Sequence, residues 1–412
     1  MDSLTQIVLG AACGEAVAGK KLGNRAMIWG AVGGTIPDLD VLSNWFLDPL
    51  DAMMFHRGPM HSLLFASILP LLAGPLVKKL YDRNWHRKKT WQWVGYGVGL
   101  LLYVAAAVLA SLIAGLVSGT TPWPVIAFFA FVGLGFFFLR YKQVLADRGP
   151  AAEPVGVGLW RRLFFWSVFT HPLLDALTTY GTQLFWPFDN MRVQISSISI
   201  VDPLYTVPFG LMLLGAALHR RDDPGRRRWV MGGIAIASIY LMLTFAHKLV
   251  VDHKFRARLN SEAIATSSRM STPSILNNAL WYAIARTDTG FIAGYYSIFD
   301  RGKPFDRLVA FPSNHHFGDN YRDDLTLQQL AWFSGGYYRL ERLASDTLLF
   351  SDLRFGSLGG RPDDPQGSVF TMKLVDLNGR LEMVPQGRPR NRPEDVAWFR
   401  KRIFGSENTN ER

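Results

Sequence analysis

Long runs without a single charged residue set the main constraint on how this chain of 412 residues can fold. Apolar runs of about 18 residues or more are typical of helices that cross a lipid bilayer. Four long runs and three shorter or interrupted ones fall in the first 250 residues: Trp91–Gly119, Trp123–Leu139, Leu204–Leu218, Trp229–Ala246, Met27–Ile36, Leu63–Val77 and Leu163–Leu177. The opening Met1-Asp2-Ser3 lacks the basic segment of a cleaved signal peptide. Residues 1–250 are therefore predicted to form a mainly α, polytopic transmembrane helix bundle.

Composition excludes two other classes of protein. Hydrophobic residues make up 49% of the chain and charged residues 19%, whereas a disordered protein has few of the former and many of the latter. The single cysteine, Cys13, excludes an intramolecular disulfide framework and a cysteine-based zinc cluster.

The net charge of +11 reflects where the basic residues fall along the chain. Of the 22 basic residues in the first 250, 19 lie in four clusters between the apolar runs: Lys20–Arg25, Lys78–Lys89, Arg140–Arg162 and Arg220–Arg228. Basic loops stay on the cytoplasmic side of a membrane, so the clusters mark that side. The alternation then places the loops 41–61 and 182–202 together on the outer side. The partner that this pattern indicates is a lipid bilayer, and no nucleic acid is expected.

Residues 251–412 have the pattern of a soluble α+β domain outside the membrane, on the same side as those loops. Asn378-Gly379 between two alternating segments is typical of a hairpin turn, because both residues accept positive φ angles. An amphipathic helix with Leu340 facing inward is predicted over Asp324–Ala344, and Arg388–Arg392 is predicted as a solvated tail. The predicted strands are Phe291–Phe299, Thr347–Phe355, Val369–Asp376 and Arg380–Val384.

Acidic and imidazole side chains gather at the predicted outer ends of the membrane helices. His171 and Asp175 are four residues apart, so both project from one face of a helix. The tight turn at Gly58-Pro59 allows the two histidines that flank it to fold toward one point. The six candidate metal ligands are Asp38, Asp40, His56, His61, His171 and Asp175.

Charged groups in membrane helices cost about 2.5–3.5 kcal/mol each on insertion scales, so each needs a partner or a function. Taken singly, they have simpler roles: Asp38 and Asp40 as loop carboxylates, His56 at the membrane interface, and His171 and Asp175 as a pair that ties two helices together. Asp202 before Pro203 is most simply a helix N-cap.

These six groups fall together on one side of the predicted membrane, and this favours a shared site for one or two divalent ions. Mixed imidazole and carboxylate ligands suit Zn, Mn or Fe better than Ca or Mg, and Zn is favoured among them.

The same residues lie within a series of ordered motifs. They are Met1-Asp2-Ser3-Leu4-Thr5-Gln6, Pro37-Asp38-Leu39-Asp40, His56-Arg57-Gly58, His61-Ser62, Thr170-His171-Pro172-Leu173-Leu174-Asp175 and Val201-Asp202-Pro203-Leu204-Tyr205. Over about residues 1–220 the chain resembles the LexA-regulated, membrane-bound, metal-dependent hydrolase family, the YdjM-like inner-membrane proteins. The resemblance implies hydrolysis, a divalent metal held at the six positions above, and a multi-pass place in the bacterial inner (cytoplasmic) membrane. Gln6 stands where some members have His.

Two classes of function follow from this reading. In a hydrolase, a metal held by these ligands would polarise a phosphoryl or carbonyl oxygen and lower the pKa of a water toward about 7. Asp40 or Asp175 would then act as general base, and Arg57 would either bind a phosphate or anchor at the headgroup level. A site at the outer interface, facing the periplasm, favours a lipid or lipid-linked substrate.

The alternative class is a metal transporter or sensor that uses the same cluster. Transporters usually contain inverted repeats. The sequence contains no visible repeat, so the hydrolase is favoured.

Overall fold

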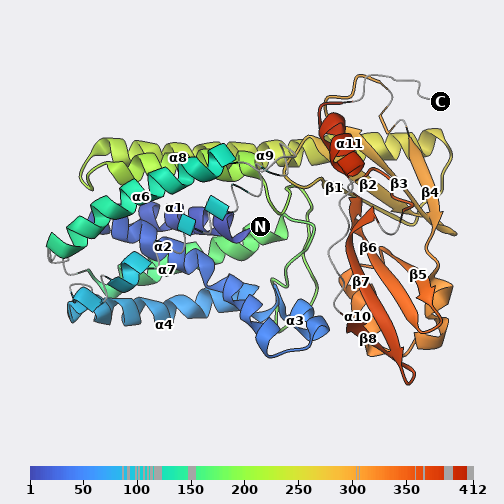
Figure 1. Cartoon of the computed structure of the whole chain (residues 1–412), viewed down its shortest axis with the longest axis horizontal. Helices are drawn as coiled ribbons and strands as arrows, with labels where there is room; N and C mark the ends of the chain where they lie inside the picture. The colour runs from blue at the N-terminus through green and yellow to red at the C-terminus, as the bar shows by residue number, and fades with distance from the viewer. Residues whose placement is uncertain are drawn as a thin grey trace.

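The computed structural model describes residues 1–85, 123–146, 155–302, 304–305, 307–357, 359–364, 367–384 and 393–405, with a few residues between 88 and 115 and only the backbone of 136–146. Figure 1 shows two parts that follow each other along the longest axis, a group of helices and a region of two β-sheets. The predicted run Trp91–Gly119 lies mostly, and the predicted tail Arg388–Arg392 wholly, outside the described residues.

The helical part is a bundle whose helices run along the long axis of the molecule (Figure 1). Its elements are α1 (Ser3–Leu22), α2 (Asn24–Thr35), η1 (Pro37–Trp45), α3 (Pro49–Phe55), η2 (Pro59–His61), α4 (Leu63–Asp82), α6 (Trp123–Ala146), α7 (Val157–Ala176), α8 (Pro203–Leu218) and α9 (Pro224–Ser261), where η marks a 3₁₀ helix. α1 packs against α2, α7 and α8, and α7 also packs against α4. The apolar runs do not predict α1, because Glu15 and many small residues interrupt its hydrophobic pattern.

Glycines let α1 and α2 touch along their backbones. A Cβ atom at Gly10 would lie 2.4 Å from the carbonyl oxygen of Gly30, and one at Gly34 would lie 2.4 Å from that of Gln6. Gly10 with Gly14, and Gly30 with Gly34, repeat at the four-residue spacing that allows close helix contact. This contact holds Gln6 next to the end of α2, where the candidate ligands begin.

Two helices in the described part of the chain, α4 and α9, are long and apolar enough to cross a membrane, judged by length and composition. The segment Trp123–Gly135 and helix α8 are also apolar but shorter. Large hydrophobic side chains on these helices are exposed, among them Leu72, Leu76, Leu211 and Ile239. A bundle with more than two membrane crossings therefore stays a prediction.

The C-terminal part contains two four-stranded antiparallel sheets. The first has the order β1 (Ser268–Pro273), β2 (Leu280–Arg286), β3 (Gly290–Ser297) and β4 (Leu308–Pro312), and the second β5 (Tyr338–Ala344), β6 (Thr347–Ser357), β7 (Ser368–Leu377) and β8 (Arg380–Val384). Ala283 pairs with Gly294 in the first sheet and Phe350 with Met372 in the second. The helical elements here are η4 (His315–Tyr321), α10 (Leu325–Phe333) and α11 (Pro393–Ile403).

The predicted hairpin is present, with Asn378 and Gly379 at φ angles of 59° and 84° between β7 and β8. The prediction of one helix over Asp324–Ala344 is correct for the first half of this segment and wrong for the second half. Its helical part ends at Phe333, and the chain continues as β5, because Gly335 and Gly336 both take positive φ angles. Leu340 is fully buried as predicted, but from a strand and not from a helix.

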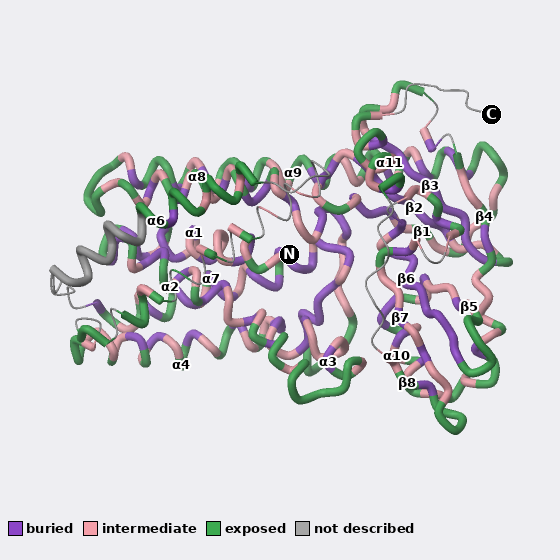
Figure 2. The backbone as a smooth tube through the Cα atoms, viewed as in Figure 1, coloured by how far each residue is buried: buried purple, intermediate pink, exposed green. Residues whose placement is uncertain are grey.

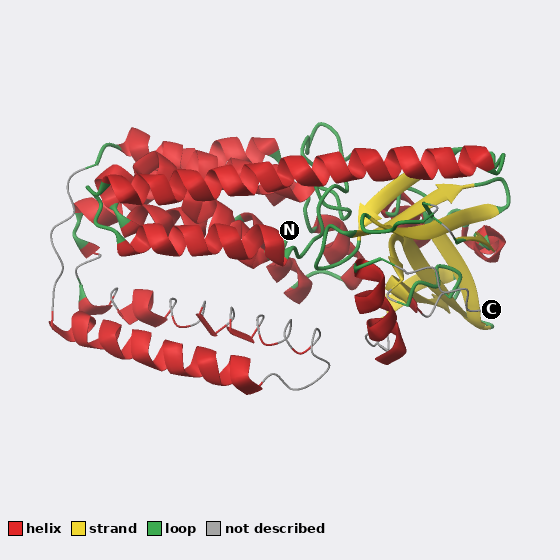
Figure 3. Cartoon of the chain, turned by 90° about the horizontal axis from the view of Figure 1, so that it is seen from above, coloured by secondary structure: helices red, strands yellow, loops and turns green. Residues whose placement is uncertain are grey.

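Helix α9 belongs to both parts of the molecule. Figure 3 shows it continuing from the bundle over the first sheet. Val251, Phe255 and Leu259 on its last turns are buried against Trp281 and Phe305 of the C-terminal part. Figure 2 shows exposed residues along the outside of α8 and α9 in the bundle, whereas the same helix α9 is partly buried where it meets the sheets.

The C-terminal part covers the end of the bundle at which the candidate ligands lie. Leu50 and Met53 of α3 pack against the hydrophobic core of the second sheet. Tyr180, which follows α7, meets Phe333 of α10 edge to face with ring centroids 5.1 Å apart. Asn278 Nδ2 donates to the carbonyl oxygen of Ser197 at 2.8 Å. We call this end of the bundle the covered end.

Candidate metal centre

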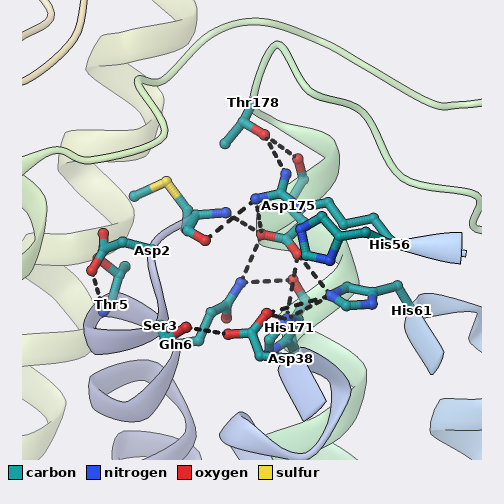
Figure 4. A network of polar contacts seen from close by, with 12 residues as sticks. Asp2, Ser3, Thr5, Gln6, Asp38, His56, His61, His171, Asp175 and Thr178 are labelled. Atoms are coloured by element: carbon teal, nitrogen blue, oxygen red, sulfur yellow. Dashed lines mark hydrogen bonds and ion pairs between the residues drawn. The ribbon is translucent and has the colours of Figure 1, made fainter. Parts of the chain in front are cut away.

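Four segments bring the candidate ligands together at the covered end. Asp38 and Asp40 lie in η1, directly after α2, and His61 ends η2. His171 and Asp175 lie one turn apart in the last part of α7, as their spacing predicts. Ser3 and Gln6, at the start of α1, lie beside them (Figure 4).

One ligand atom from each of four residues, Asp38, His61, His171 and Asp175, lies within 4.8 Å of the others. The two imidazole Nε2 atoms are 3.1 Å apart. Asp38 Oδ1 lies 3.6 Å from His61 Nε2 and 3.4 Å from His171 Nε2. Asp175 Oδ2 lies 3.2 Å and 3.3 Å from the same two nitrogens. We call these four residues the His/Asp cluster.

These separations fit a single tetrahedral cation. Bonds of about 2.1 Å to four tetrahedral ligands place the ligand atoms about 3.4 Å from one another. Five of the six separations in the cluster are 3.1–3.6 Å. Asp175 Oδ2 is buried and accepts no hydrogen bond from any residue that the structure describes. Two imidazoles and two carboxylates therefore have both the chemistry and the spacing to hold a divalent metal ion.

Each member of the cluster is also held by a second contact on its far side. His171 Nδ1 lies 2.6 Å from the carbonyl oxygen of Gly34, so Nδ1 carries the proton and Nε2 keeps its lone pair for the cluster. Asp38 Oδ2 accepts a hydrogen bond from Ser3 Oγ at 2.8 Å. His61 Nδ1 lies 3.1 Å from Asp40 Oδ2. These contacts fix the side chains in the orientation that a bound metal needs.

Asp175 is held in the same way through its other oxygen. Asp175 Oδ1 accepts from Gln6 Nε2 at 3.0 Å and from the amino group of Met1, and Arg57 Nη2 lies 3.5 Å away. Figure 4 shows Gln6 and Asp175 pointing toward each other beside the cluster. Gln6 thus orients a ligand and is not itself a member of the His/Asp cluster.

Asp40 and His56 lie behind His61 and outside the four converging atoms. Asp40 Oδ1 is 2.8 Å from His56 Nδ1, and Asp40 Oδ2 accepts from the backbone N–H of Arg57 at 2.9 Å. Both carboxylate oxygens are therefore occupied, and the Asp40 side chain is fully buried. The structure thus separates the six predicted ligands into a cluster of four and a supporting pair.

The carboxylates and imidazoles in and beside the cluster shift one another's pKa values. Burial raises the pKa of Asp38, but the neighbouring imidazoles of His171 and His61 outweigh it and hold that pKa below its usual value. The pKa of Asp40 is lowered in the same way, because hydrogen bonds with His56 and His61 outweigh burial. Burial alone would lower the pKa of His61, but Asp175, Asp38 and Asp40 raise it to about 10.

Arg57 is buried beside the cluster. Its side chain donates from Nη1 to Thr178 Oγ1 at 2.8 Å and lies over the ring of Tyr180 at 5.0 Å. Nε is buried without a hydrogen-bond partner among the described residues. Its backbone has a φ of 58°, which the contact between its N–H and Asp40 stabilises.

Other polar residues of the chain lie away from the His/Asp cluster. Asp202 caps α8 through the N–H groups of Leu204 and Tyr205, as its position before Pro203 indicates. Glu15 forms a buried double hydrogen bond with Arg226, with both distances 2.6 Å, at the other end of the bundle. His315 lies in the C-terminal part, with Nε2 2.9 Å from the carbonyl oxygen of Tyr338.

Sequence reasoning does not identify three residues that support the cluster: Ser3, Gly34 and Thr178. Gly34 acts through its carbonyl oxygen, which every residue type has, so its identity carries no signal for this role. Ser3 stands within the opening motif, and its hydroxyl group is a possible partner for a carboxylate; Thr178 instead binds Arg57 and the backbone carbonyl oxygen of Asp175.

The comparisons with known proteins agree with the motifs. Residues 1–250 match the family described as YdjM inner membrane protein. No curated protein and no solved structure matches the chain. The family match covers more than half of the chain and includes the whole His/Asp cluster. The chain belongs to the YdjM inner membrane protein family.

Proposed function

We propose that this protein is a metal-dependent hydrolase embedded in the inner membrane. The observation that carries the proposal is the His/Asp cluster, in which five of the six separations between the four ligand atoms are 3.1–3.6 Å and the far side of each ligand is held by a partner. Such preorganised sites of imidazoles and carboxylates are typical of zinc enzymes, and structural zinc sites more often contain cysteine.

Asp38, His61, His171 and Asp175 would hold the ion. A divalent cation bound there would polarise an ester or phosphoester oxygen and lower the pKa of a water toward about 7. Asp38 is the most exposed of the four ligand side chains, at 14%, whereas the other three are at 0%. Substrate therefore reaches the centre from the side of Asp38.

His56 is better placed than Asp40 to transfer a proton. Asp40 has both oxygens engaged, whereas the His56 side chain is 31% exposed and is held through Nδ1 by Asp40. The rings of His56 and His61 are 6.0 Å apart, so His56 lies one water away from the cluster. A histidine oriented by a buried carboxylate is a common arrangement for general acid–base catalysis. We assign that role to His56, with Asp40 as its positioning residue.

Arg57 supplies positive charge next to the reacting groups. It lies 3.5 Å from Asp175 Oδ1, and its unpartnered Nε–H is available to a developing negative charge. In a buried site, a fixed cation of this kind stabilises an anionic transition state, such as that of phosphoester or ester hydrolysis.

The substrate class follows from the surroundings of the centre. Large hydrophobic side chains on the loops at the covered end are exposed, including Trp45, Phe46 and Phe188 at 77%, 82% and 86%. Aromatic residues of this kind gather where a protein meets the membrane interface. We propose a multi-pass topology in which this end faces the periplasm and the substrate is a lipid or a lipid-linked phosphate.

The test is a turnover screen of purified protein, loaded with Zn, Mn or Fe, on lipids that carry phosphoester or acyl-ester bonds. We expect one class to be hydrolysed by the parent protein and by H315A, and not by H61A. If the parent binds metal tightly but hydrolyses no member of either class, the cluster serves metal transport or sensing.

A further inference from the structure

A second polar cavity lies beside the covered end of the bundle, outside the His/Asp cluster. Its volume is about 570 Å³, within the range of small-molecule sites. Three segments line it: one face of α9, strand β1 with the residue before it, and the loop that follows α7. The residues that decide its chemistry are Lys248, Asp252, Arg256, Arg269 and Ser271.

Lys248 and Asp252 form a closed network with Ser271 on one wall of the cavity. Lys248 Nζ donates to the carbonyl oxygen of Ser271 at 3.0 Å and to its Oγ at 3.2 Å. Ser271 Oγ donates to Asp252 Oδ1 at 2.5 Å, and Lys248 Nζ lies 3.4 Å from Asp252 Oδ2. Asp252, the one carboxylate among the described residues that line the cavity, is therefore already neutralised by a lysine.

Two further cations remain without a counter-charge. Arg256 on α9 and Arg269 on β1 form no hydrogen bond and no ion pair with any residue that the structure describes. They project from two different elements onto one cavity, which Ser196 and Ser267 also line. Guanidinium groups and hydroxyls are the donors that bind a phosphate group.

The distance of the cavity along α9 from the end of the uncharged run of this helix indicates the source of that phosphate. The uncharged run of α9 ends at Ala246. With a rise of 1.5 Å per residue, Lys248 lies about 3 Å, Asp252 about 9 Å and Arg256 about 15 Å beyond it. The headgroup layer of a bilayer is about 5–8 Å thick on each side. The cavity therefore begins within this layer, and the long arginine side chains can reach back into it.

We propose that this cavity binds the phosphate group of a phospholipid headgroup. The site uses none of the residues of the His/Asp cluster and does not depend on hydrolysis. It is nevertheless connected to that cluster through the backbone. Ile195 and Ser197 donate to the carbonyl oxygens of Ala176 and Leu177, directly after Asp175. A bound headgroup would thus order the loop that follows the metal ligands.

Native mass spectrometry of the full-length protein in detergent tests the proposal. The probes are phosphatidylglycerol, a diacylglycerol that lacks phosphate, and water-soluble glycerol phosphate. We expect the parent protein to bind phosphatidylglycerol in preference to the other two. Arg256→Gln combined with Arg269→Gln should weaken that binding about 10- to 30-fold, since each cation near the surface contributes about a factor of five.

Two matched variants complete the experiment. Arg301→Gln combined with Arg380→Gln removes the same charge from exposed positions away from the cavity and should leave binding unchanged. Arg256→Lys combined with Arg269→Lys keeps the charge and should keep most of the binding. Equal loss in the cavity variant and the matched control would overturn the proposal, as would full lipid binding by the cavity variant. Tight binding of glycerol phosphate without phosphatidylglycerol would overturn the lipid source.

Discussion

At the scale of residues, Asp38 and Asp40 are two positions apart in the chain but have different surroundings. Asp38 Oδ1 faces both cluster imidazoles, and its side chain keeps some exposure. Asp40 is fully buried and binds His56, His61 and the backbone of Arg57. The first is placed as a ligand and the second as a support for His61 and His56.

This difference predicts different losses when each carboxylate is replaced by the isosteric amide. Asp38→Asn removes a ligand, and we expect metal affinity to fall by more than about 100-fold. Asp40→Asn removes only a support, and the expected fall is about 10- to 100-fold, with a larger effect on turnover than on metal content. Chelator competition gives the affinities. Equal metal affinity in both variants would show that the two carboxylates are equivalent.

Metal binding should also depend on pH in a defined direction. Burial lowers the pKa of His61, but its three carboxylate neighbours raise it to about 10. Without a cation the imidazole is therefore protonated at neutral pH, and a metal must displace this proton. We predict that apparent metal affinity rises with pH from 6 to 9, about tenfold per unit for one displaced proton. A pH-independent affinity would contradict this account of His61.

The sequence predicts much of the centre because spacing and side-chain type carry the signal. His171 and Asp175 share a helix face at a separation of four residues, and this needs no tertiary information. The division between ligands and supports does not follow from sequence, because it depends on how η1 and η2 turn relative to α7. The role of Gly34 is equally hidden, because its backbone carbonyl makes the contact.

At the scale of elements, the contact between α1 and α2 determines how closely Gln6 and Gly34 approach the cluster. A Cβ atom at Gly30 would lie 2.3 Å from the carbonyl oxygen of Gly10, so the helices must separate to admit it. At Gly158 in α7 a Cβ atom meets nothing within 4 Å. The two glycines are therefore a matched pair for testing this contact.

We predict that Gly30→Ala destabilises the protein by about 1–3 kcal/mol, the usual cost of overpacking, and lowers metal occupancy. Gly158→Ala should leave both unchanged or raise stability slightly, because alanine favours a helix. Thermal unfolding and metal content of the two variants in the same detergent check the prediction. Equal behaviour of the two variants would show that the backbone contact does not support the centre.

Elements that are determined by a short local motif could be predicted from the sequence. Elements whose ends depend on a turn inside an otherwise helical pattern could be predicted only in part. Asn378-Gly379 fixes its hairpin locally, and the structure contains it. The hydrophobic pattern of Asp324–Ala344 fits a helix throughout, yet Gly335 and Gly336 end the helix and turn the rest into β5. Buried residues such as Leu340 satisfy both patterns, so periodicity alone could not separate them.

At the scale of the whole molecule, α9 connects the bundle to the sheets as one continuous helix (Figure 3). The edge-to-face contact of Tyr180 with Phe333 and the hydrogen bond of Arg354 Nη1 to Gln194 Oε1 join the same two parts. The C-terminal part thus covers the end of the bundle that holds the His/Asp cluster. The division of basic residues along the sequence predicts the membrane part, whereas nothing in residues 251–412 predicts this covering position.

The proposed topology makes a prediction for labelling in intact cells. In a C13A background, cysteines at the exposed positions Asp48 and Arg322 should react with a membrane-impermeant maleimide, because both lie on the side of the covered end. A cysteine at Arg83, after α4, should be protected until the membrane is permeabilised. Labelling of all three from the same side would reject the threading inferred from the basic clusters.

The central claim is that Asp38, His61, His171 and Asp175 form one metal centre, and the metal content of the purified protein tests it most directly. We expect about one ion per chain in the parent protein and in H315A, whose imidazole binds a backbone carbonyl far from the cluster. His171→Ala should retain less than about a tenth of that amount, since it removes a nitrogen at the centre of the cluster. Full occupancy in H171A, or an equal loss in H315A, would contradict the account.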